Sequence, residues 1–166
     1  MRKFILVAAM ALTASLALSA CNKSSDQQAT QQTAQQAPKP TDPNDAKAWN
    51  AYLSQIVQKN MQGMSANQPY AYLVKAPVDD EAKAQNERQL QGIQDTVARG
   101  VLPGNMLAFA GPDSVATADL VIAAFKDAKP GSFKDVIVLF IGDKADEQRV
   151  SDVLKPTGAT IRFVVM

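Results

Sequence analysis

The chain has 166 residues, with 17 Lys and Arg against 16 Asp and Glu, a formal net charge of +1 and no histidine. A near-neutral chain offers no broad basic surface, so we do not expect nucleic acid or an anionic lipid surface as its partner. Without histidine, the usual general base, the usual zinc nitrogen ligand and every Ser-His or Cys-His nucleophile system are missing. The composition therefore argues against these classes of enzyme.

Residues 1 to 20 have the pattern of an export signal. Met1-Arg2-Lys3 is a short cationic start, and residues 4 to 18 are apolar apart from Thr13 and Ser15. This length is typical of a signal peptide and too short to span a bilayer as a helix. Removal of this segment would leave 15 basic and 16 acidic residues in the mature chain.

The signal segment ends in Leu18-Ser19-Ala20-Cys21, and Cys21 is the single cysteine of the chain. These four residues resemble the lipobox of bacterial lipoproteins, a resemblance that covers only the first 21 residues. It implies cleavage before Cys21, a diacylglyceryl thioether on its sulfur and usually a further acyl chain on the new amino group. Several acyl chains give stable anchoring where one binds reversibly. The alternative is a secreted protein with a chance cysteine at the cleavage site.

Asn22 follows Cys21, where the enteric rule for retention in the inner membrane has aspartate. By resemblance to that rule, we expect an anchor in the outer membrane facing the periplasm if the organism is Gram-negative. Otherwise we expect the anchor in the outer face of the cell membrane. No disulfide or thiol chemistry would then remain for the mature domain, although the exported compartment permits disulfides.

A linker follows over residues 21–44, where Gln, Ala, Ser and Thr alternate and three prolines close the stretch. With no aromatic and no large aliphatic residue, it buries too little surface to offset the entropy cost of ordering, so we predict disorder. As a loose coil it would reach roughly 25 Å. A recognition or aggregation role for the Gln-rich run is the alternative. Residues 45–166 remain as one domain.

The domain alternates helical and strand patterns. We predict helices over residues 45–62, 79–99, from 113 or 114 to the Pro130-Gly131 stop, and 143–155, and strands over residues 69–75, 106–110, 136–141 and 159–166. After the first helix the order is β-α-β-α-β-α-β, typical of a mainly parallel sheet with right-handed crossovers. We expect a small three-layer α/β domain with a four-stranded, Rossmann-like or flavodoxin-like sheet. The last strand could equally pair antiparallel at an edge.

Carboxylates follow each of the first three predicted strands: Asp79 and Asp80, then Asp113, then Asp143. In open α/β sheets ligands bind outside the carboxyl ends of the strands, so these side chains would serve as oxygen ligands for Mg²⁺ or Ca²⁺ if they converge. The competing interpretation is helix capping, because aspartate at a helix start accepts from free N–H groups. We favour capping, since it predicts aspartate at every strand-to-helix junction without a ligand.

Two further sets of residues invite a functional interpretation. Ser114 and Lys144 would lie on neighbouring loops as nucleophile and base, although a helix start and a solvated side chain explain them more simply. Ile161, Arg162 and Phe163 lie on the terminal strand, whose backbone would be open to another chain if it forms an edge. The alternative is an internal or protected strand.

These observations favour a non-enzymatic envelope lipoprotein whose tethered domain binds a protein, either as an accessory part of an envelope assembly or as an inhibitor or immunity factor. Apart from the lipid on Cys21, we expect no cofactor. The alternative is a domain that binds a divalent metal or a small ligand through the acidic loops at the strand ends. Such a domain could also be weakly catalytic.

Overall fold

The structure, a computed structural model of the chain, describes residues 38 to 166. The predicted signal segment, Cys21 and most of the predicted linker lie outside the described residues. Every element below belongs to one compact unit of the chain. None of the helices in this part is both long and apolar enough to cross a membrane.

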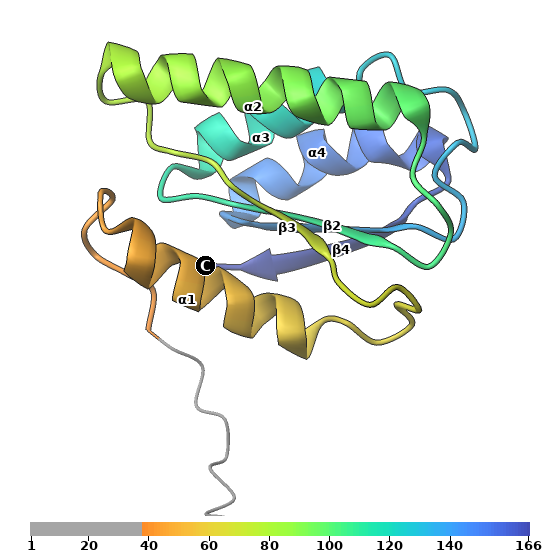
Figure 1. The fold of residues 1–166 in the computed structure, drawn as a ribbon, viewed down its shortest axis with the longest axis horizontal. Helices are drawn as coiled ribbons and strands as arrows, with labels where there is room; N and C mark the ends of the chain where they lie inside the picture. Colours follow the sequence, from red (N-terminus) through yellow and green to blue (C-terminus); the bar gives the residue numbers. More distant parts are fainter. Residues whose placement is uncertain (1–37) are drawn as a thin grey trace, which may run out of the picture. The chain divides into compact units, whose positions relative to one another are not determined.

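Four parallel strands form one sheet between two helical layers (Figure 1). The strands are β1 (Tyr70–Leu73), β2 (Met106–Ala110), β3 (Ile137–Gly142) and β4 (Thr160–Val165), and each pairs in parallel with the next. The helices are α1 (Ala46–Lys59), α2 (Asp80–Arg99), α3 (Ser114–Phe125) and α4 (Glu147–Leu154). The predicted α/β class with a mainly parallel sheet is confirmed. The sequence left open whether the last strand pairs parallel or antiparallel, and β4 pairs parallel with β3.

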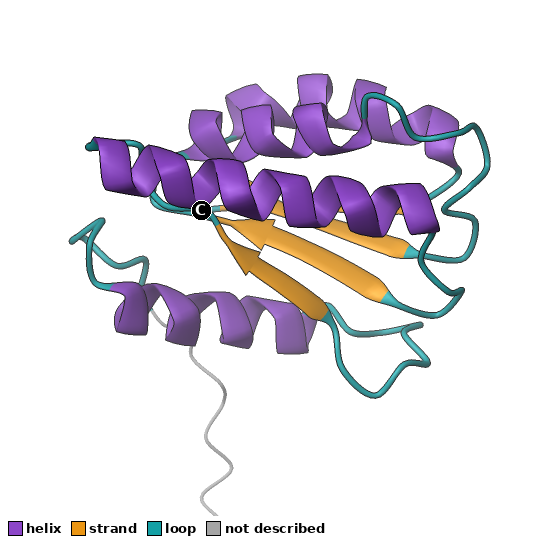
Figure 2. Cartoon of the chain, turned by 45° about the horizontal axis from the view of Figure 1, so that its top comes forward, coloured by secondary structure: helices purple, strands orange, loops and turns teal. Residues whose placement is uncertain are grey.

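The strand order β1-β2-β3-β4 decides which face each helix covers. Successive crossovers step in the same direction across the sheet and share one handedness, so α2, α3 and α4 fall on the same face. The first helix, α1, alone covers the other face (Figure 1, Figure 2). Because the order never reverses, the sheet has no switch point of the kind at which doubly wound sheets bind ligands.

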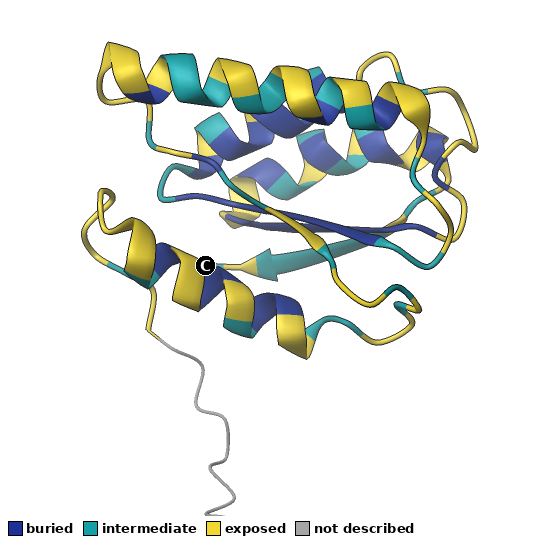
Figure 3. Cartoon of the chain, viewed as in Figure 1, coloured by how far each residue is buried: buried dark blue, intermediate teal, exposed yellow. Residues whose placement is uncertain are grey.

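The two faces bury separate apolar clusters, because successive side chains of a strand alternate between faces. The cluster on the α1 face is Trp49, Tyr52, Leu53, Ile56, Val57, Met106, Ala108, Ala110, Ile137, Leu139 and Ile141. On the other face, alternate residues of β2 and β3 pack against α2, α3 and α4. Every residue of β2 and β3 is buried, whereas β1 and β4 are partly exposed (Figure 3).

A row of aromatic residues crosses the whole sheet on the α2–α4 face. The register pairs Tyr72 with Phe109, Phe109 with Phe140, and Phe140 with Phe163. The outer pairs are stacked, with ring centroids 5.1 Å apart for Tyr72 and Phe109 and 5.8 Å apart for Phe140 and Phe163. Burial raises the pKa of the Tyr72 phenol above its ordinary value. We call these four residues the aromatic row.

Three helices differ from their predicted bounds by more than one residue, and the first of them, α1, ends at Lys59 instead of residue 62. The predicted helix over 143–155 begins with a 3-10 turn over Lys144–Asp146 before α4, because the Asp146 carboxylate turns inward and is buried. The third helix ends at Phe125 rather than at Pro130-Gly131. Beyond it the chain turns back to bury Phe133 against Phe125, with ring centroids 5.1 Å apart.

Arg162 of β4 joins the edge of the sheet to the end of α1. Its guanidinium donates to the carbonyl oxygens of Asn60 and Gln62, where α1 ends. Carbonyls at a helix end lack partners within the helix, and a cation there also suits the helix dipole. Arg162, predicted at the sequence level as part of a partner-binding edge, thus has partners inside its own domain.

We expect Arg162→Ala to lower the free energy of unfolding by about 1.5–3 kcal/mol, because it removes charge-assisted hydrogen bonds to two carbonyls at the end of α1. Urea denaturation of the purified chain measures the change. The matched control is Arg88→Ala on the exposed side of α2, expected within about 0.5 kcal/mol of the parent. Equal losses in the two variants would contradict a capping role for Arg162.

Candidate functional site

The aspartates predicted at the strand ends do not share one site. Asp79 accepts from the Ala82 N–H at 2.7 Å and Asp113 from the Ala116 N–H at 2.9 Å, so both cap helices. Asp80 lies in the first turn of α2, fully exposed, with its carboxylate 3.5 Å from Lys83 Nζ.

Asp143 precedes the 3-10 turn, and its side chain makes no capping hydrogen bond. Between residues 38 and 166, no three Asp, Glu, His or Cys side chains lie close enough together to hold a metal ion. Asp79 and Asp113 therefore have the capping role predicted as one alternative from the sequence. Asp80 and Asp143 cap no helix with their side chains.

Ser114 and Asp146 form a buried polar pair where β2 and β3 end. Ser114 Oγ donates to Asp146 Oδ2 at 2.5 Å and accepts from the Asp143 N–H at 2.7 Å. Both residues are only 5% exposed. A Cβ on Gly142 would lie 2.7 Å from Ser114 Oγ, so the close approach of these loops requires glycine there. The pair joins the start of α3 to the turn before α4.

Arg149 extends this pair to the surface. Its Nε donates to Asp146 Oδ1 at 2.8 Å, its Nη1 to Asp119 Oδ1 at 2.5 Å and its Nη2 to the Val115 carbonyl at 3.1 Å. The hydrogen bond to Asp119 raises the pKa of Arg149 above its ordinary value, and the bond to Asp146 adds to the effect. The Asp146 charge is therefore paired and hydrogen-bonded, as a buried carboxylate needs to be.

The pairing of Ser114 with Lys144, weighed as a nucleophile and base, is not among the hydrogen bonds of residues 38 to 166. Lys144 Nζ pairs with Glu147 and lies 5.6 Å from the centroid of the Phe163 ring. The Ser114 hydroxyl is buried and donates its hydrogen bond to Asp146. We therefore interpret Ser114 as structural.

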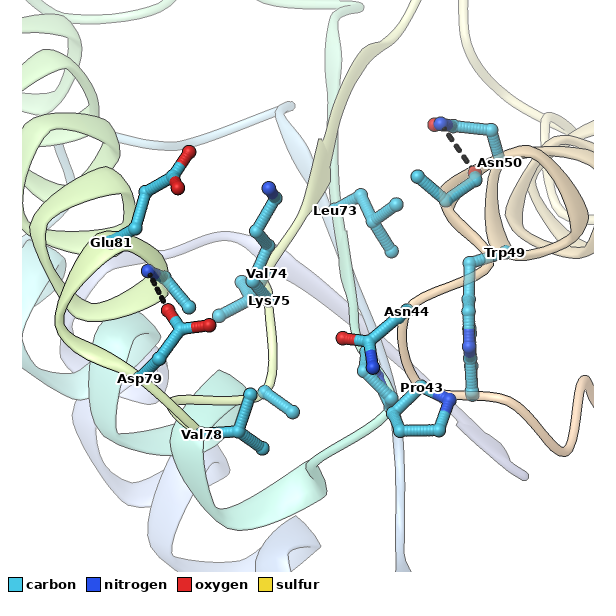
Figure 4. A pocket seen from close by; sticks show the side chains of 14 residues that line it. Pro43, Asn44, Trp49, Asn50, Leu73, Val74, Lys75, Val78, Asp79 and Glu81 are labelled. Carbon is cyan, nitrogen blue, oxygen red and sulfur yellow. Dashed lines mark hydrogen bonds between the residues drawn. The ribbon is translucent and has the colours of Figure 1, made fainter.

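A pocket of about 380 Å³ opens beside the carboxyl end of β1, between the starts of α1 and α2 (Figure 4). Its wall includes Pro43, Asn44, Trp49, Asn50, Leu73, Val74, Lys75, Val78, Asp79 and Glu81. Of the four predicted aspartates, only Asp79 lines it. Trp49 is 1% exposed and donates from Nε1 to the Asp42 carbonyl at 2.9 Å, so its main role is packing in the core.

Side chains from α2 cover the carboxyl end of the outer edge of β1. The Val74 N–H bonds Ala110 of β2, so Leu73 and Lys75 direct their backbone groups away from the sheet. Asn86 supplies both missing partners to Lys75, accepting from its N–H at 3.0 Å and donating to its carbonyl at 2.8 Å. Gln89 donates to the Leu73 carbonyl at 3.3 Å. At this end of β1 the amide side chains take the place that an added strand would need, whereas they make no hydrogen bond to Ala71 in the middle of the strand.

Within residues 38 to 166, the outer edge of β4 has no such cover. The N–H groups of Thr160 and Met166 bond β3 at 2.8 and 3.1 Å, which fixes the even-numbered residues as those that face β3. Ile161, Phe163 and Val165 therefore direct their N–H and C=O groups outward. Within the described part of the chain, no hydrogen bond reaches these outward groups. We call the outward backbone of these three residues the open β4 edge.

The open β4 edge also lacks the features that usually block strand addition. Such edges typically carry proline, an outward lysine or a bulge. β4 reads Thr-Ile-Arg-Phe-Val-Val, pairs with β3 without a bulge, and its one charged residue, Arg162, is bound to the end of α1. Val165 is an exposed large apolar side chain on this strand. Chain position and β-propensity were the sequence signals for this edge, but the exposed backbone itself depends on strand order.

We expect Ser114→Ala to lower the free energy of unfolding by about 1–3 kcal/mol, because it leaves the buried Oδ2 atom of Asp146 and the Asp143 N–H without their partner. Chemical denaturation measures the loss. Ser54→Ala, on the exposed face of α1, is the matched control and should change stability by less than about 0.5 kcal/mol. A neutral Ser114→Ala would show that the pair does not hold the two loops together.

Comparison with known proteins adds no further constraint on this site. No family model, no curated protein and no solved structure matches this chain. The features that bear on function are therefore the open β4 edge, the pocket beside β1 and the buried Ser114–Asp146 pair.

Proposed function

We propose that the protein is a non-enzymatic, membrane-anchored lipoprotein whose α/β domain binds a protein segment by strand addition at the open β4 edge. The observation that carries the proposal is the difference between the two edges. Asn86 and Gln89 bond three outward groups at the carboxyl end of the β1 edge, whereas within the described residues no outward group of Ile161, Phe163 or Val165 in β4 has a partner.

Strand addition uses the chemistry that this edge offers. Three outward residues present three N–H donors and three C=O acceptors, and main-chain hydrogen bonds supply affinity in this mode of recognition. Ile161 and Phe163 pack partly against the core on the α4 face, which holds the strand in place. A fitting partner is an extended segment with β-branched or aromatic residues opposite Ile161, Phe163 and Val165, because such cross-strand pairs are favourable.

The expected membrane address suits a binding role. A lipid on Cys21 would hold the domain at the outer membrane, or at the outer face of the cell membrane, and a linker reaching roughly 25 Å would let it search for a partner nearby. The partner would then be another envelope protein. An accessory part of an assembly and an inhibitor or immunity factor both use such an arrangement.

The proposal predicts contact at Val165 in cells. A photo-crosslinking amino acid at Val165, 54% exposed at the open edge, should give a discrete crosslinked product. The same amino acid at Leu102, 78% exposed and before the start of β2, should give none. Adding Ile161→Lys should remove the product, because a charge on the edge opposes strand addition. Indistinguishable product patterns at Val165 and Leu102 would contradict the proposal.

Small-ligand binding is the second candidate function, favoured by the pocket beside β1. Asp79, Glu81 and Lys75 line its polar side and Trp49 and Leu73 its apolar side. Mixed walls of this kind are typical of ligand sites, although this pocket is near the small end of their usual volumes. A divalent cation, Mg²⁺ or Ca²⁺, would take oxygen ligands from Asp79 and Glu81 there.

Helix capping and metal binding at Asp79 predict different melting behaviour. If capping is its role, Asp79→Ala and Asp113→Ala should each cost about 1 kcal/mol, equally with and without millimolar Mg²⁺ or Ca²⁺. Asp113 caps α3 outside the pocket and so serves as the control. A metal-induced rise in the melting temperature of the parent, absent in Asp79→Ala but kept in Asp113→Ala, would instead establish a metal site.

A further inference from the structure

We infer that the segment added at the open β4 edge is the β4 strand of a second copy of this chain, an inference that rests on the proposed function. The two β4 strands would run antiparallel about a two-fold axis that passes beside Phe163, perpendicular to the sheet. The four-stranded sheets would then join into one continuous sheet of eight strands.

The spacing of the outward residues fits this axis. Ile161 and Val165 lie two positions on either side of Phe163, and all three face outward. An antiparallel pairing places Phe163 opposite Phe163 of the second copy and Ile161 opposite Val165. Each is a pair that exchanges two N–H to O=C hydrogen bonds. Every outward donor and acceptor of β4 would therefore find a partner without a shift in register.

The side chains are compatible with the same pairing. A two-fold axis perpendicular to the sheet keeps each face on its own side, so Phe163 meets Phe163 on the α2–α4 face and the aromatic row continues into the second copy. On the α1 face, Arg162 would lie opposite Val164, not opposite another cation. Lys144, close to the Phe163 ring, is paired with Glu147, so its charge near the axis is compensated.

The difference between the two edges favours an assembly of two copies joined through β4. Asn86 and Gln89 cover the carboxyl end of the β1 edge, so within residues 38 to 166 β4 is the edge that an added strand can pair with along its whole length. A single self-complementary edge gives a closed two-fold dimer, whereas two open edges would propagate a fibre.

The same axis suits a membrane-anchored chain. Both α1 helices would lie on one face of the joined sheet, so both chains would enter their domains from the same side. Two tethers on one side can reach a single membrane. Confinement to that membrane would raise the effective concentration of one β4 edge near another.

Disulfide trapping in membranes of cells expressing the full-length chain tests the register. Opposed residues of this kind have Cα atoms about 5.5 Å apart, within the range that a disulfide bridges. Phe163→Cys should give a disulfide-linked dimer, identified by mass spectrometry of the peptide joined to itself through position 163. The unaltered chain controls for Cys21, and Leu102→Cys controls for random collision.

A double variant keeps the test independent of any damage to the aromatic row. Ile161→Cys with Val165→Cys should link the two different positions between copies, while either single variant should link far less, because neither position lies opposite itself. Val165→Lys in the Phe163→Cys background should weaken dimer formation roughly tenfold, since the change acts at two places in each dimer. Val78→Lys, at another exposed valine, should leave it unchanged.

The outcomes separate this inference from the proposed function. Register-specific disulfides support both. If Val165 photo-crosslinks to a different envelope protein and no register-specific disulfide forms, the inference of a second copy is overturned. The proposal of strand addition at β4 then still stands. If neither the disulfides nor an edge-specific photo-crosslink forms, both fail.

Discussion

The complete burial of β2 and β3 on both faces is the constraint on which the rest of this structure depends. A strand without exposed side chains needs a helical layer above and below it. The crossovers supply three helices to one face, so α1 alone must cover the other. This single helix carries much of one core cluster, and Arg162 joins its end to the sheet. The edge strand and the isolated helix are thus held by the same side chain.

The sequential strand order also determines where function is to be sought. A doubly wound sheet opens a crevice where its strand order reverses, and ligands gather there. This sheet has no reversal, and the loops after β2 and β3 are joined by the buried Ser114–Asp146 pair. Within the described residues, the β1 edge is covered at its carboxyl end by Asn86 and Gln89, whereas the backbone of β4 is exposed along its outer edge. The balance of features therefore favours main-chain recognition over chemistry at the strand ends.

Local patterns in the sequence were enough to predict the elements and their order. Asp79 and Asp113 indicated where two helices begin, and each side chain accepts a capping hydrogen bond from a backbone N–H. The apolar run of β3 is continuous, a pattern typical of a strand covered on both faces, and every residue of β3 is buried. These signals are local, since a cap or a strand period involves residues within one turn or one strand of each other.

The rest depended on contacts between residues far apart in the chain. Arg162 binds Asn60 across 102 positions, and Ser114 binds Asp146 across 32, so no spacing rule could have assigned them to one another. For the same reason Arg162 was predicted on a partner-binding edge, although its guanidinium turns inward. The open edge itself belongs to the backbone, and it becomes visible only when strand order shows that β4 has one neighbour. A strand can thus be predicted from local sequence. Whether the N–H and C=O groups on its outer side have partners depends on the strand order, which the local sequence does not specify.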